Sequence, residues 1–420
     1  MSFSDWKEVT LGDYINVKHG YAFKGEFFSE IETENVLVTP GNFQIGGGFK
    51  EDKLKYYNGE YPNEYVLKPN DVIVTMTDLS KAGDTLGYSA LVPYKEKRRY
   101  LHNQRIGLVE FLSEEIFPLF LYWRLRNKDY QNYIVGSASG TTVKHTSPKT
   151  IKSFTLNLPP LREQKVIAAT LSCIDNKIEV NNKIKEKLEN MALEIFKHWF
   201  IDFEFSNENG NPYKSSDGKM VESELGDIPE GWGICNLEDI AEVVMGQSPK
   251  SDTYNNDNIG LPLINGASDF KKGNINPLKY TSNPKKKSQR GDYVFGVRAT
   301  VGNVTYVDKE YALGRGVGIA RSKMKSLNEF LYFVLVKGIN YLESTATGSV
   351  YINLSKDDFR FMKVISPPDR LINDFHRITI NIFEEINLKH QENLYLQELR
   401  DTLLPKLLSG EIELPTYEEV

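Results

Sequence analysis

The stretch from Trp6 to Gly20 reads WKEVTLGDYINVKHG, and the stretch from Trp232 to Gly246 reads WGICNLEDIAEVVMG. Trp, Leu, Asp, Val and Gly recur in both at the same internal spacings, with an offset of 226 residues. Chance does not readily produce agreement at five spaced positions. The two stretches therefore predict that the chain contains two copies of one structural unit.

Later matches keep the same order in both halves. Leu54-Lys55-Tyr56 corresponds to Leu278-Lys279-Tyr280, and Pro159-Pro160 corresponds to Pro367-Pro368, where the offset has fallen to 208. Shorter loops in the second copy explain this drift, because loops on a common frame vary in length. The period is far longer than that of solenoid repeats, so each copy is expected to be a domain with its own core.

Length and composition agree with two globular domains. The 420 residues exceed the size at which a single core usually stops growing. The start of the chain lacks the features of a secretory signal, and the densest apolar run, Ile116 to Trp123, is too short to cross a bilayer. Cys173 and Cys235 are the only cysteines, and the histidines are scattered. We expect a soluble cytoplasmic protein without a membrane segment, a disulfide framework or a metal site.

The charge of the chain is distributed unevenly. The net charge is -6, but residues 232–368 carry 18 basic and 13 acidic side chains, whereas residues 369–420 carry 5 and 11. Residues 1–160 carry 19 of each sign. Because the negative charge lies outside the globular halves, it does not argue against binding of a polyanion by those halves.

Each globular half shows short β-branched and aromatic runs that are interrupted by Gly, Asn and Pro. Val72–Val74, Tyr293–Phe295 and Val317–Ile319 are predicted to be strands. One helix is expected in each half, at about Phe117–Arg126 and Asn328–Lys337. This pattern predicts two β-rich α/β domains.

Two long amphipathic helices follow the proline pairs. Apolar residues recur every three or four positions from Leu161 to Phe200, a length of roughly 60 Å at 1.5 Å per residue, and the pattern returns after Pro368. One small domain cannot cover such a helix, so each helix is expected to pair with the other. The predicted helix-pair interface consists of Ile167, Leu171, Ile174, Ile178, Leu188, Met191, Ile195, Phe375, Ile382, Ile386, Leu396, Leu399 and Leu403.

Polar residues interrupt these apolar stripes. Asn181 and Lys389 occupy equivalent positions, where polar residues can fix the register of paired helices. A polar defect at a solvent-exposed end explains them equally well. Pro405 is predicted to break the second helix near its end.

At these residues the sequence resembles the specificity (S) subunits of type I restriction-modification systems, over nearly its whole length. The resemblance rests on the Trp-x4-Leu-x-Asp start of each half and on four further motifs. The second helix departs from the family by opening Pro367-Pro368-Asp369-Arg370 without the usual Glu-Gln. The four motifs are LPPLREQ at 158–164, FKHWF at 196–200, GQSP at 246–249 and LLPKLLSGEI at 403–412.

The resemblance implies an α/β fold in which two target recognition domains are joined by two long antiparallel coiled-coil helices, as an internal pseudo-two-fold repeat. It implies that each domain reads one half of a bipartite DNA site, while the helices set the spacer and dock two methyltransferase subunits. Such a complex methylates adenine with S-adenosylmethionine held by the partners, so no cofactor is expected in this chain, and a restriction subunit can join. The expected segments are domain 1 (1–158), helix 1 (159–205), a polar connector (206–231), domain 2 (232–366), helix 2 (367–412) and an acidic tail (413–420).

DNA recognition combines phosphate contacts from basic side chains with base-edge contacts from polar side chains on loops. Candidate residues are therefore polar and lie near glycines, with Lys285–Lys287 as a phosphate-binding cluster. For any one of them, a solvated surface charge is the commoner role. The candidates are Lys24, Lys81, Arg105, Thr142, Lys144 and His145 in domain 1, and Gln247, Lys250, Lys285, Lys286, Lys287, Arg298, Arg315, Ser349, Tyr351 and Asn353 in domain 2.

Catalysis by this chain is not predicted. Asn157-Leu158-Pro159-Pro160 only mimics the Asn-Pro-Pro-aromatic turn of a methyltransferase, because Leu158 intervenes and a proline helix start is expected there. The sequence contains neither GxGxxG nor GxxxxGK[ST]. Glu51-Asp52-Lys53 alone does not make a nuclease site. The remaining alternative is a non-catalytic scaffold in which the helices bind proteins and the domains bind proteins or another nucleic acid.

Overall fold

The structure is a computed structural model that describes residues 6–80, 82–271, 273–297, 304–345 and 354–412. The chain divides into two compact units, of which unit 1 comprises residues 1–179 and 394–420, and unit 2 comprises residues 180–393. Each unit thus contains one globular domain, the first part of the long helix that follows it, and the last part of the other long helix. The sequence analysis treats each long helix as one segment. In the structure, each long helix has one part in unit 1 and the other part in unit 2.

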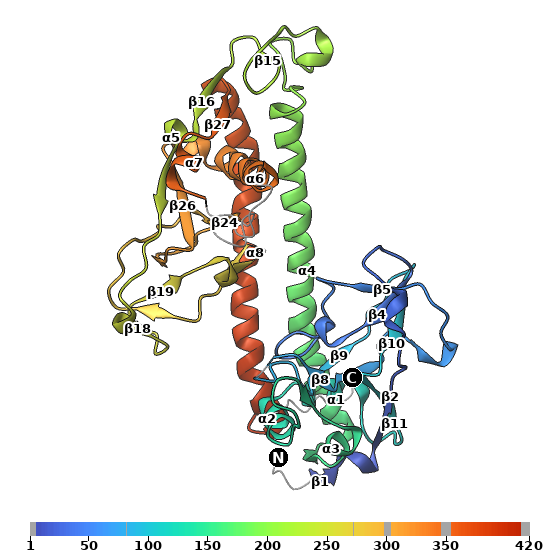
Figure 1. Ribbon diagram of the computed structural model, residues 1–420. Helices are drawn as coiled ribbons and strands as arrows, with labels where there is room; N and C mark the ends of the chain where they lie inside the picture. Colours follow the sequence, from blue (N-terminus) through green and yellow to red (C-terminus); the bar gives the residue numbers. More distant parts are fainter. Residues whose placement is uncertain (1–5, 81, 272, 298–303, 346–353, 413–420) are drawn as a thin grey trace, which may run out of the picture. The chain divides into compact units, whose positions relative to one another are not determined.

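The two long helices are α4 (Leu161–Phe200) and α8 (Asp369–Ser409). α4 has the bounds that the sequence predicts. α8 continues through Pro405 to Ser409, so the predicted break is wrong. Leu404, Leu407 and Leu408 around this proline are buried in the core of unit 1, and their packing offsets the hydrogen bond that proline cannot donate. In each unit, parts of α4 and α8 lie side by side (Figure 1).

The domain of unit 1 is built on two sheets. One is antiparallel with the order β2-β11-β7-β9, and the other has the order β3-β5-β4-β10-β6 with a parallel β4–β10 pair. The first and last strands of the domain, β1 and β13, pair with each other. The strands are β1 (Lys7–Thr10), β2 (Ile15–His19), β3 (Phe28–Ser29), β4 (Asn35–Val38), β5 (Lys55–Tyr57), β6 (Val66–Leu67), β7 (Val72–Thr75), β8 (Thr77–Asp78), β9 (Ser89–Leu91), β10 (Arg99–His102), β11 (Ile106–Phe111), β12 (Lys144–His145) and β13 (Thr155–Leu158). The short helices are α1 (Pro118–Arg124), α2 (Lys128–Gly136) and α3 (Pro148–Lys152).

The domain of unit 2 repeats this plan. Its antiparallel sheet has the order β17-β26-β23-β24, its second sheet has the order β18-β22-β19-β25 with a parallel β19–β25 pair, and β16 pairs with β27. These strands are β16 (Gly233–Asn236), β17 (Ala241–Met245), β18 (Tyr254–Asn255), β19 (Leu261–Ile264), β22 (Tyr280–Thr281), β23 (Tyr293–Gly296), β24 (Val304–Tyr306), β25 (Ala312–Leu313), β26 (Val317–Ser322) and β27 (Lys363–Ser366). The remaining elements are β14 (Met220–Val221), β15 (Ile228–Pro229), β20 (Phe270–Lys271), β21 (Asn274–Ile275), α5 (Leu237–Ile240), α6 (Asn328–Thr345) and α7 (Lys356–Arg360).

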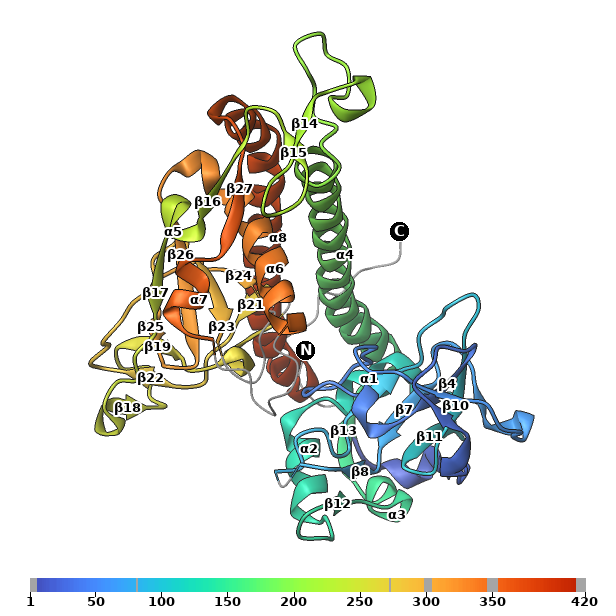
Figure 2. The ribbon, with the colours of Figure 1, turned by 45° about the horizontal axis from the view of Figure 1, so that its top comes forward.

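The antiparallel sheets of the two domains have the same strand order. The second sheets also correspond, except that β6 of unit 1 has no counterpart among the described strands of unit 2, and this shared plan confirms the internal repeat. The central strands bury side chains on both faces because successive residues point to opposite sides. In unit 1, Val72 and Val74 enter one core cluster and Ile73 enters another. In unit 2, Tyr293 and Phe295 enter one cluster and Val294 the other, and α6 covers the face that carries the two aromatic residues (Figure 2).

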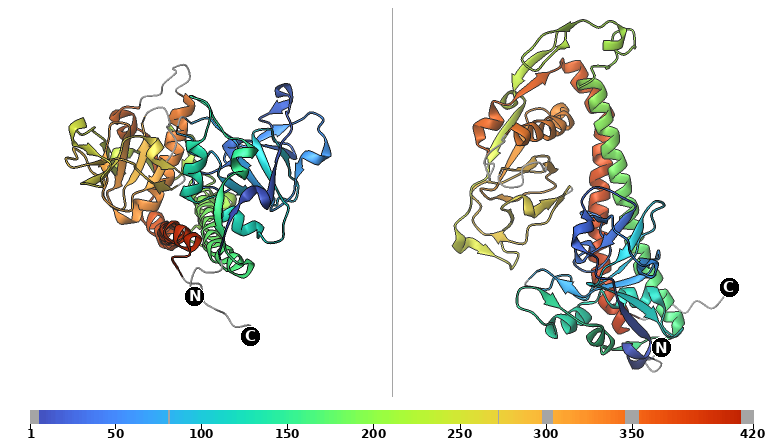
Figure 3. Two further views of the ribbon diagram at one scale, coloured as in Figure 1. Left: turned by 90° about the horizontal axis from the view of Figure 1, so that it is seen from below. Right: turned by 45° about the vertical axis from the view of Figure 1, so that its right-hand side comes forward.

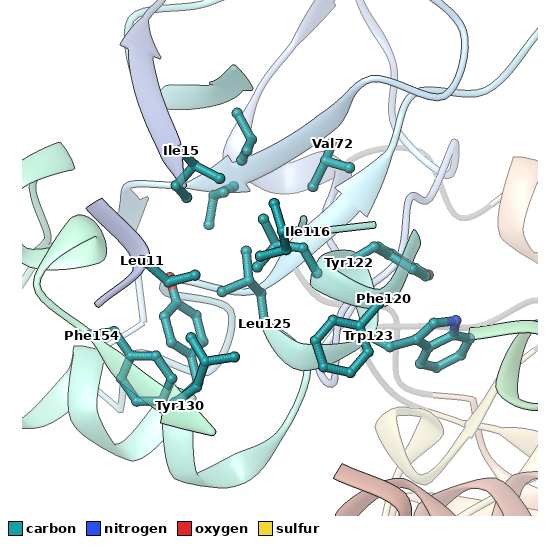
Figure 4. Close-up of a cluster of buried hydrophobic side chains, with 14 of the residues drawn as sticks. Leu11, Ile15, Val72, Ile116, Phe120, Tyr122, Trp123, Leu125, Tyr130 and Phe154 are labelled. Atoms are coloured by element: carbon teal, nitrogen blue, oxygen red, sulfur yellow. The ribbon is translucent and has the colours of Figure 1, made fainter. Parts of the chain in front are cut away.

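The helices contribute directly to both cores. In unit 1, Ile167 and Leu171 of α4 join a cluster that includes Phe120, Trp123 and Tyr130 (Figure 4). Trp123 also donates a hydrogen bond from Nε1 to Ser172 Oγ at 2.9 Å. In unit 2, Phe196 and Phe200 of α4 lie against Phe330 of α6 and Phe375 of α8. Because these side chains are large, apolar and buried, they anchor each domain to the helix parts of its own unit.

A second anchor in unit 1 is ionic. Arg126 is buried, and its guanidinium contacts Asp175 Oδ2 at 2.8 Å, while Arg400 of α8 contacts Asp175 Oδ1 at 2.8 Å. Arg126 also lies over the Trp123 ring. One carboxylate of α4 thus holds both the domain and α8 within this unit.

The segment between α4 and domain 2 is folded. Phe205 stacks on Tyr213 and on Trp232, and β14 pairs with β15 in a small hairpin beyond the end of α4 (Figure 3). The predicted polar connector is therefore more structured than a linker, because aromatic residues at its two ends pack together.

The predicted helix-pair residues differ in burial. Ile167, Leu171, Ile178 and Phe375 are buried, whereas the exposed fraction of Met191 is 54%, so the buried seam does not include Met191. Asn181 is buried and donates a hydrogen bond to Asn393 Oδ1 at 2.9 Å, whereas Lys389 is half-buried and pairs with Glu385 and Glu392. The half-buried residues are Ile174, Leu188, Ile195, Ile382, Ile386, Leu396, Leu399 and Leu403.

Candidate nucleic-acid interface

In each domain, the repeated glycine after the first strand of the antiparallel sheet allows two loops to meet. A Cβ atom added at Gly20 would lie 2.2 Å from the Asn103 carbonyl oxygen, and one at Gly246 would lie 2.1 Å from that of Gly314. Real Cβ atoms do not approach an oxygen so closely, so only glycine fits at either position. The repeated glycine therefore marks the place where loops converge at the end of the sheet.

Four segments converge at this place in domain 1. The Tyr21 N–H donates to the His102 carbonyl at 2.8 Å, and the Gln104 N–H donates back to Tyr21 at 2.9 Å. The Met76 N–H donates to the Arg105 carbonyl at 2.9 Å, and the Thr146 N–H donates to Met76 at 3.0 Å. Residues 20–24, 76–80, 103–105 and 140–146 are called the domain 1 loop cluster below.

The domain 1 loop cluster carries several of the predicted DNA-binding residues. Lys24, Arg105, Thr142 and His145 are exposed, and Lys144 is half-buried in β12, which pairs with β8. His145 Nδ1 lies 3.2 Å from Thr77 Oγ1. The structure thus brings together, at one end of a rigid sheet, candidates that lie more than a hundred residues apart in the sequence.

Asp78 organises part of this cluster and was not predicted. Its carboxylate accepts hydrogen bonds from the backbone N–H of Ser80 at 2.6 Å and from the Thr85 hydroxyl at 2.7 Å. Burial opposes ionisation of Asp78, but the hydrogen bonds from Ser80 and Thr85 outweigh it and lower the pKa of the carboxyl. The ionised carboxylate of Asp78 therefore stabilises the turn after β8. This role depends on contacts that form only when the loop folds.

Domain 2 has a corresponding loop cluster with other side chains. The Gln247 N–H donates to the Leu313 carbonyl at 2.9 Å, and the Val297 N–H donates to Gly316 at 3.1 Å. Gln247, Lys250 and Arg315 are exposed. Residues 246–250, 297 and 314–316 are called the domain 2 loop cluster. The two clusters share their backbone construction, whereas Gln247 and Arg315 stand where domain 1 has Tyr21 and Gln104.

The lysine triplet lies beside the domain 2 loop cluster. Lys285, Lys286 and Lys287 are exposed, and the Lys286 carbonyl accepts a hydrogen bond at 2.9 Å from Leu313, the residue that also receives the Gln247 N–H. Lys287 Nζ is 3.9 Å from Glu310. An ion pair so long and exposed neutralises little of the local positive charge. The predicted phosphate-binding cluster therefore adjoins the predicted base-contacting loops.

Five predicted residues lie outside the described part of the chain. They are Lys81, Arg298, Ser349, Tyr351 and Asn353.

Exposed apolar residues on the long helices were also not predicted. Met191 belongs to the predicted helix-pair interface, whereas the others stand outside the apolar stripes, and their only signal in the sequence is a large apolar side chain among charged neighbours. In unit 2 these residues are Val180, Met191, Leu193, Ile378 and Leu388, and in unit 1 they are Leu161, Leu394 and Tyr395.

Two further types of site were sought in the described residues. No group of three or more His, Cys, Asp or Glu side chains that could hold a metal ion occurs among them. None of their helices is long and apolar enough to span a membrane.

Comparison with known proteins adds the family. The sequence profile of the type I restriction modification DNA specificity domain matches residues 3–190 and again residues 229–393. The chain belongs to this family. The double match coincides with the two copies seen in the sheets, and the chain is thus a type I DNA specificity subunit.

Individual proteins to which the chain is similar are also type I specificity subunits. The chain is 31% identical to the MjaX type I specificity subunit of Methanocaldococcus jannaschii, over 77% of this chain and 75% of the relative. It is 24% identical to the HindI type I specificity subunit of Haemophilus influenzae, over 97% of this chain and 100% of the relative. The fold resembles the crystal structure of a type I restriction-modification S subunit from M. genitalium, with a TM-score of 0.55 and 18% identity over 96% of both chains.

Proposed function

We propose that each domain of this specificity subunit reads one half of a bipartite, asymmetric DNA site through its loop cluster. The observation that carries this proposal is that the two clusters have the same backbone construction but different exposed side chains. Direct readout of bases depends on side-chain donors and acceptors, so two such clusters select two different half-sites. The long helices then set the number of base pairs between the half-sites.

The partners that we propose are two methyltransferase subunits, which dock on the long helices, and a restriction subunit that joins for cleavage. The exposed apolar residues of α4 and α8 support a docking role, because large apolar side chains exposed on a surface commonly mark contact sites. The partners would bind S-adenosylmethionine and methylate an adenine that leaves the base stack. This chain would contribute recognition without a cofactor of its own, in the cytoplasm where the DNA lies.

The first test is the DNA methylation pattern of cells that express the methyltransferase subunit with and without this chain. We expect a new split motif, two short half-sites around a fixed spacer, only when both proteins are present. Long-read sequencing that detects methylated adenine measures it. A soluble complex that leaves no split motif, and that binds all DNA sequences equally in vitro, would favour the scaffold alternative.

The lysine triplet gives a separate test of the interface. Reversal of Lys285, Lys286 and Lys287 to Glu should weaken binding to all DNA sequences, because phosphate contacts are lost. The slope of log affinity against log salt should flatten by about 0.9 for each lost contact. Reversal of Lys323 and Lys325 is the matched control, since these exposed lysines follow the opposite end of β26. An unchanged salt slope in the triplet variant would remove these residues from the interface.

Docking is tested on Leu388, whose side chain is exposed on α8. Leu388→Glu should reduce co-purification of the methyltransferase subunit while leaving the melting temperature unchanged, because the substitution adds a charge to a contact surface without disturbing a core. Leu278→Glu is the control, because Leu278 is also an exposed leucine of unit 2 but belongs to domain 2 and not to a long helix. Equal recovery of complex with both variants would count against docking at this part of α8.

A further inference from the structure

The segment that carries the lysine triplet has an equivalent in domain 1 with other side chains. In domain 1, β6 pairs with β10, and Val66 lies opposite Leu101. In domain 2, Lys287 lies opposite Ala312 of β25 in a single antiparallel bridge. Leu101 and Ala312 correspond, because each precedes the residue whose carbonyl accepts the N–H that follows the repeated glycine. Val66 and Lys287 therefore occupy equivalent positions, 221 residues apart.

The turn that follows in each domain supports this equivalence. The Asp71 carboxylate accepts a hydrogen bond from the Lys68 N–H at 2.7 Å, and the Asp292 carboxylate accepts one from the Gln289 N–H at 2.7 Å. Both residues of the second pair lie 221 positions after those of the first. In domain 1, the residues that stand in place of the lysine triplet are therefore Glu64, Tyr65 and Val66.

The exchange of side chains changes the charge beside the two loop clusters. In domain 1, Lys18 Nζ lies 3.7 Å from Glu64, and these two side chains together have no net charge. In domain 2, Glu310 opposes only one of the three lysines, which leaves a net charge of +2. A cation that contacts phosphate releases counterions and makes binding depend on salt, whereas a neutral contact does not.

Tyr65 is the neutral side chain that stands where domain 2 has Lys286. The centroid of its ring lies 5.2 Å from that of Tyr21, a member of the domain 1 loop cluster, and 5.1 Å from Lys18 Nζ. Tyr65 is half-buried, so these contacts hold the ring in place while part of the side chain stays accessible. Tyrosine side chains donate hydrogen bonds to phosphate and sugar oxygens in complexes with DNA. A tyrosine at this position can therefore contact DNA without adding charge.

We propose that this equivalent place contacts the DNA backbone in both domains, through the Tyr65 hydroxyl in domain 1 and through the lysine triplet in domain 2. The inference rests on the proposed function only in that each loop cluster faces DNA, and it adds Tyr65 to the residues that contact DNA. The contact in domain 1 keeps its strength as the salt concentration rises, whereas the contact in domain 2 weakens. At this place the two half-sites are thus held with unequal dependence on salt.

The difference in charge is tested by exchanging single residues between equivalent positions. The probe is a duplex of random sequence, long enough to span both domains, and the full chain binds it over a range of salt concentrations. Glu64→Lys, which copies Lys285, should steepen the slope of log affinity against log salt by about 0.9, and Lys285→Glu should flatten it by about 0.9. An unchanged slope in a folded Glu64→Lys variant would overturn the proposal.

Glu114→Lys is the matched control for Glu64→Lys. Glu114 is exposed and follows the end of β11 that pairs with the start of β2, whereas the domain 1 loop cluster follows the end of β2. The same change of charge there should leave the slope as it is in the unaltered chain. A slope that steepens equally in both variants would mean that overall charge, and not a contact at Glu64, causes the effect, and would also overturn the proposal.

Tyr65→Phe tests the hydroxyl group. Loss of one hydrogen bond to DNA should weaken binding by about threefold to tenfold at every salt concentration, and the slope should stay unchanged. Tyr94→Phe is the control, since Tyr94 is exposed and follows the end of β9 that pairs with Val72, at the opposite end of β7 from Met76. Undiminished binding by Tyr65→Phe would remove Tyr65 from the interface.

These outcomes are separable from those of the proposed function, because the random duplex contains no defined half-site. Slopes that change as expected in a chain that produces no split motif would support the inference and contradict the reading of half-sites. Unchanged slopes in a chain that does produce the motif would overturn the inference alone.

Discussion

His102 in domain 1 occupies the position that Leu313 occupies in domain 2, because each accepts the backbone N–H that follows the repeated glycine. His102 is buried, and its Nε2 lies 2.8 Å from the Ile106 carbonyl oxygen, so Nε2 carries the proton and donates it. Nδ1 has no partner among the described residues. Burial lowers the pKa of His102 to about 4, so the imidazole is neutral in the folded protein at pH 7.

The stability of domain 1 should therefore depend on pH through this residue. Below its ordinary pKa of about 6.5, the unfolded chain takes up a proton that the folded chain accepts only near pH 4. As the pH is lowered from about 6.5 to about 4, the free energy of unfolding should decrease by on the order of 2–3 kcal/mol in total. His102→Leu, which copies domain 2, should remove this part of the pH dependence.

Urea denaturation of both proteins at several pH values between 4 and 7.5 measures the difference. His19→Leu is a suitable control, since that histidine is exposed in the same domain. Parallel pH profiles of the unaltered protein and His102→Leu would show that His102 is not the titrating group.

Asparagines form a polar contact between α4 and α8 at the edge of unit 2. The Asn181 amide donates to Asn393 Oδ1, and the Asn393 amide donates to Asn182 Oδ1, both at 2.9 Å. Asn181 and Asn393 are buried, and Asn181 Oδ1 forms no hydrogen bond in the described structure. Buried asparagines in paired helices commonly fix register at some cost in stability, which the apolar stripe on either side offsets.

We expect a strong coupling between these two asparagines. Asn181→Leu or Asn393→Leu alone should lower the free energy of unfolding by about 1–2 kcal/mol, because each leaves a buried amide without its partner. The double variant should be about as stable as the unaltered protein or more so, since two apolar side chains replace the pair. A double-mutant cycle in urea gives the coupling energy. Additive losses would mean that the asparagines act independently and do not fix the register.

At the scale of the molecule, the repeat makes each domain a separable reader. β16 and β27 pair with each other, so the domain begins and ends at one place in unit 2, as β1 and β13 do in unit 1. A domain whose ends meet can be exchanged without disturbing the helices that follow it.

Exchange of residues 232–366 for the same segment of a relative with another specificity should change one half of the methylated motif and leave the other half and the spacer unchanged. Reciprocal exchange of residues 1–158 should change the opposite half. Adenine methylation mapped by long-read sequencing is the measurement. A motif that changes in both halves, or in neither, would contradict independent reading by the two domains.

Much of this architecture could be predicted before any coordinates. The spaced matches from Trp6 to Gly20 predicted the repeat, and the three-to-four periodicity predicted α4 with its observed bounds, because local spacing of apolar side chains determines which helix face can be buried. The break at Pro405 was wrong, since burial of the neighbouring leucines in the core of unit 1 outweighs a local helix-breaking tendency. Asn181 was correctly singled out, but its partner could not be found from equivalent positions, because antiparallel packing brings together different positions of the two helices.

The duplication, the long helices and the family could be predicted because each rests on the spacing of residues within short stretches of the chain. Which loops meet is visible only in the folded chain, because the contacts between Tyr21, Met76, Arg105 and Thr146 join segments that no local pattern relates. The tertiary structure also decided that the side chain of Lys185 is largely buried, because the residues around it come from elements far apart in the sequence. The spacing of apolar side chains is a local property of the chain. The burial of a side chain and the meeting of distant loops depend on every segment that packs around them.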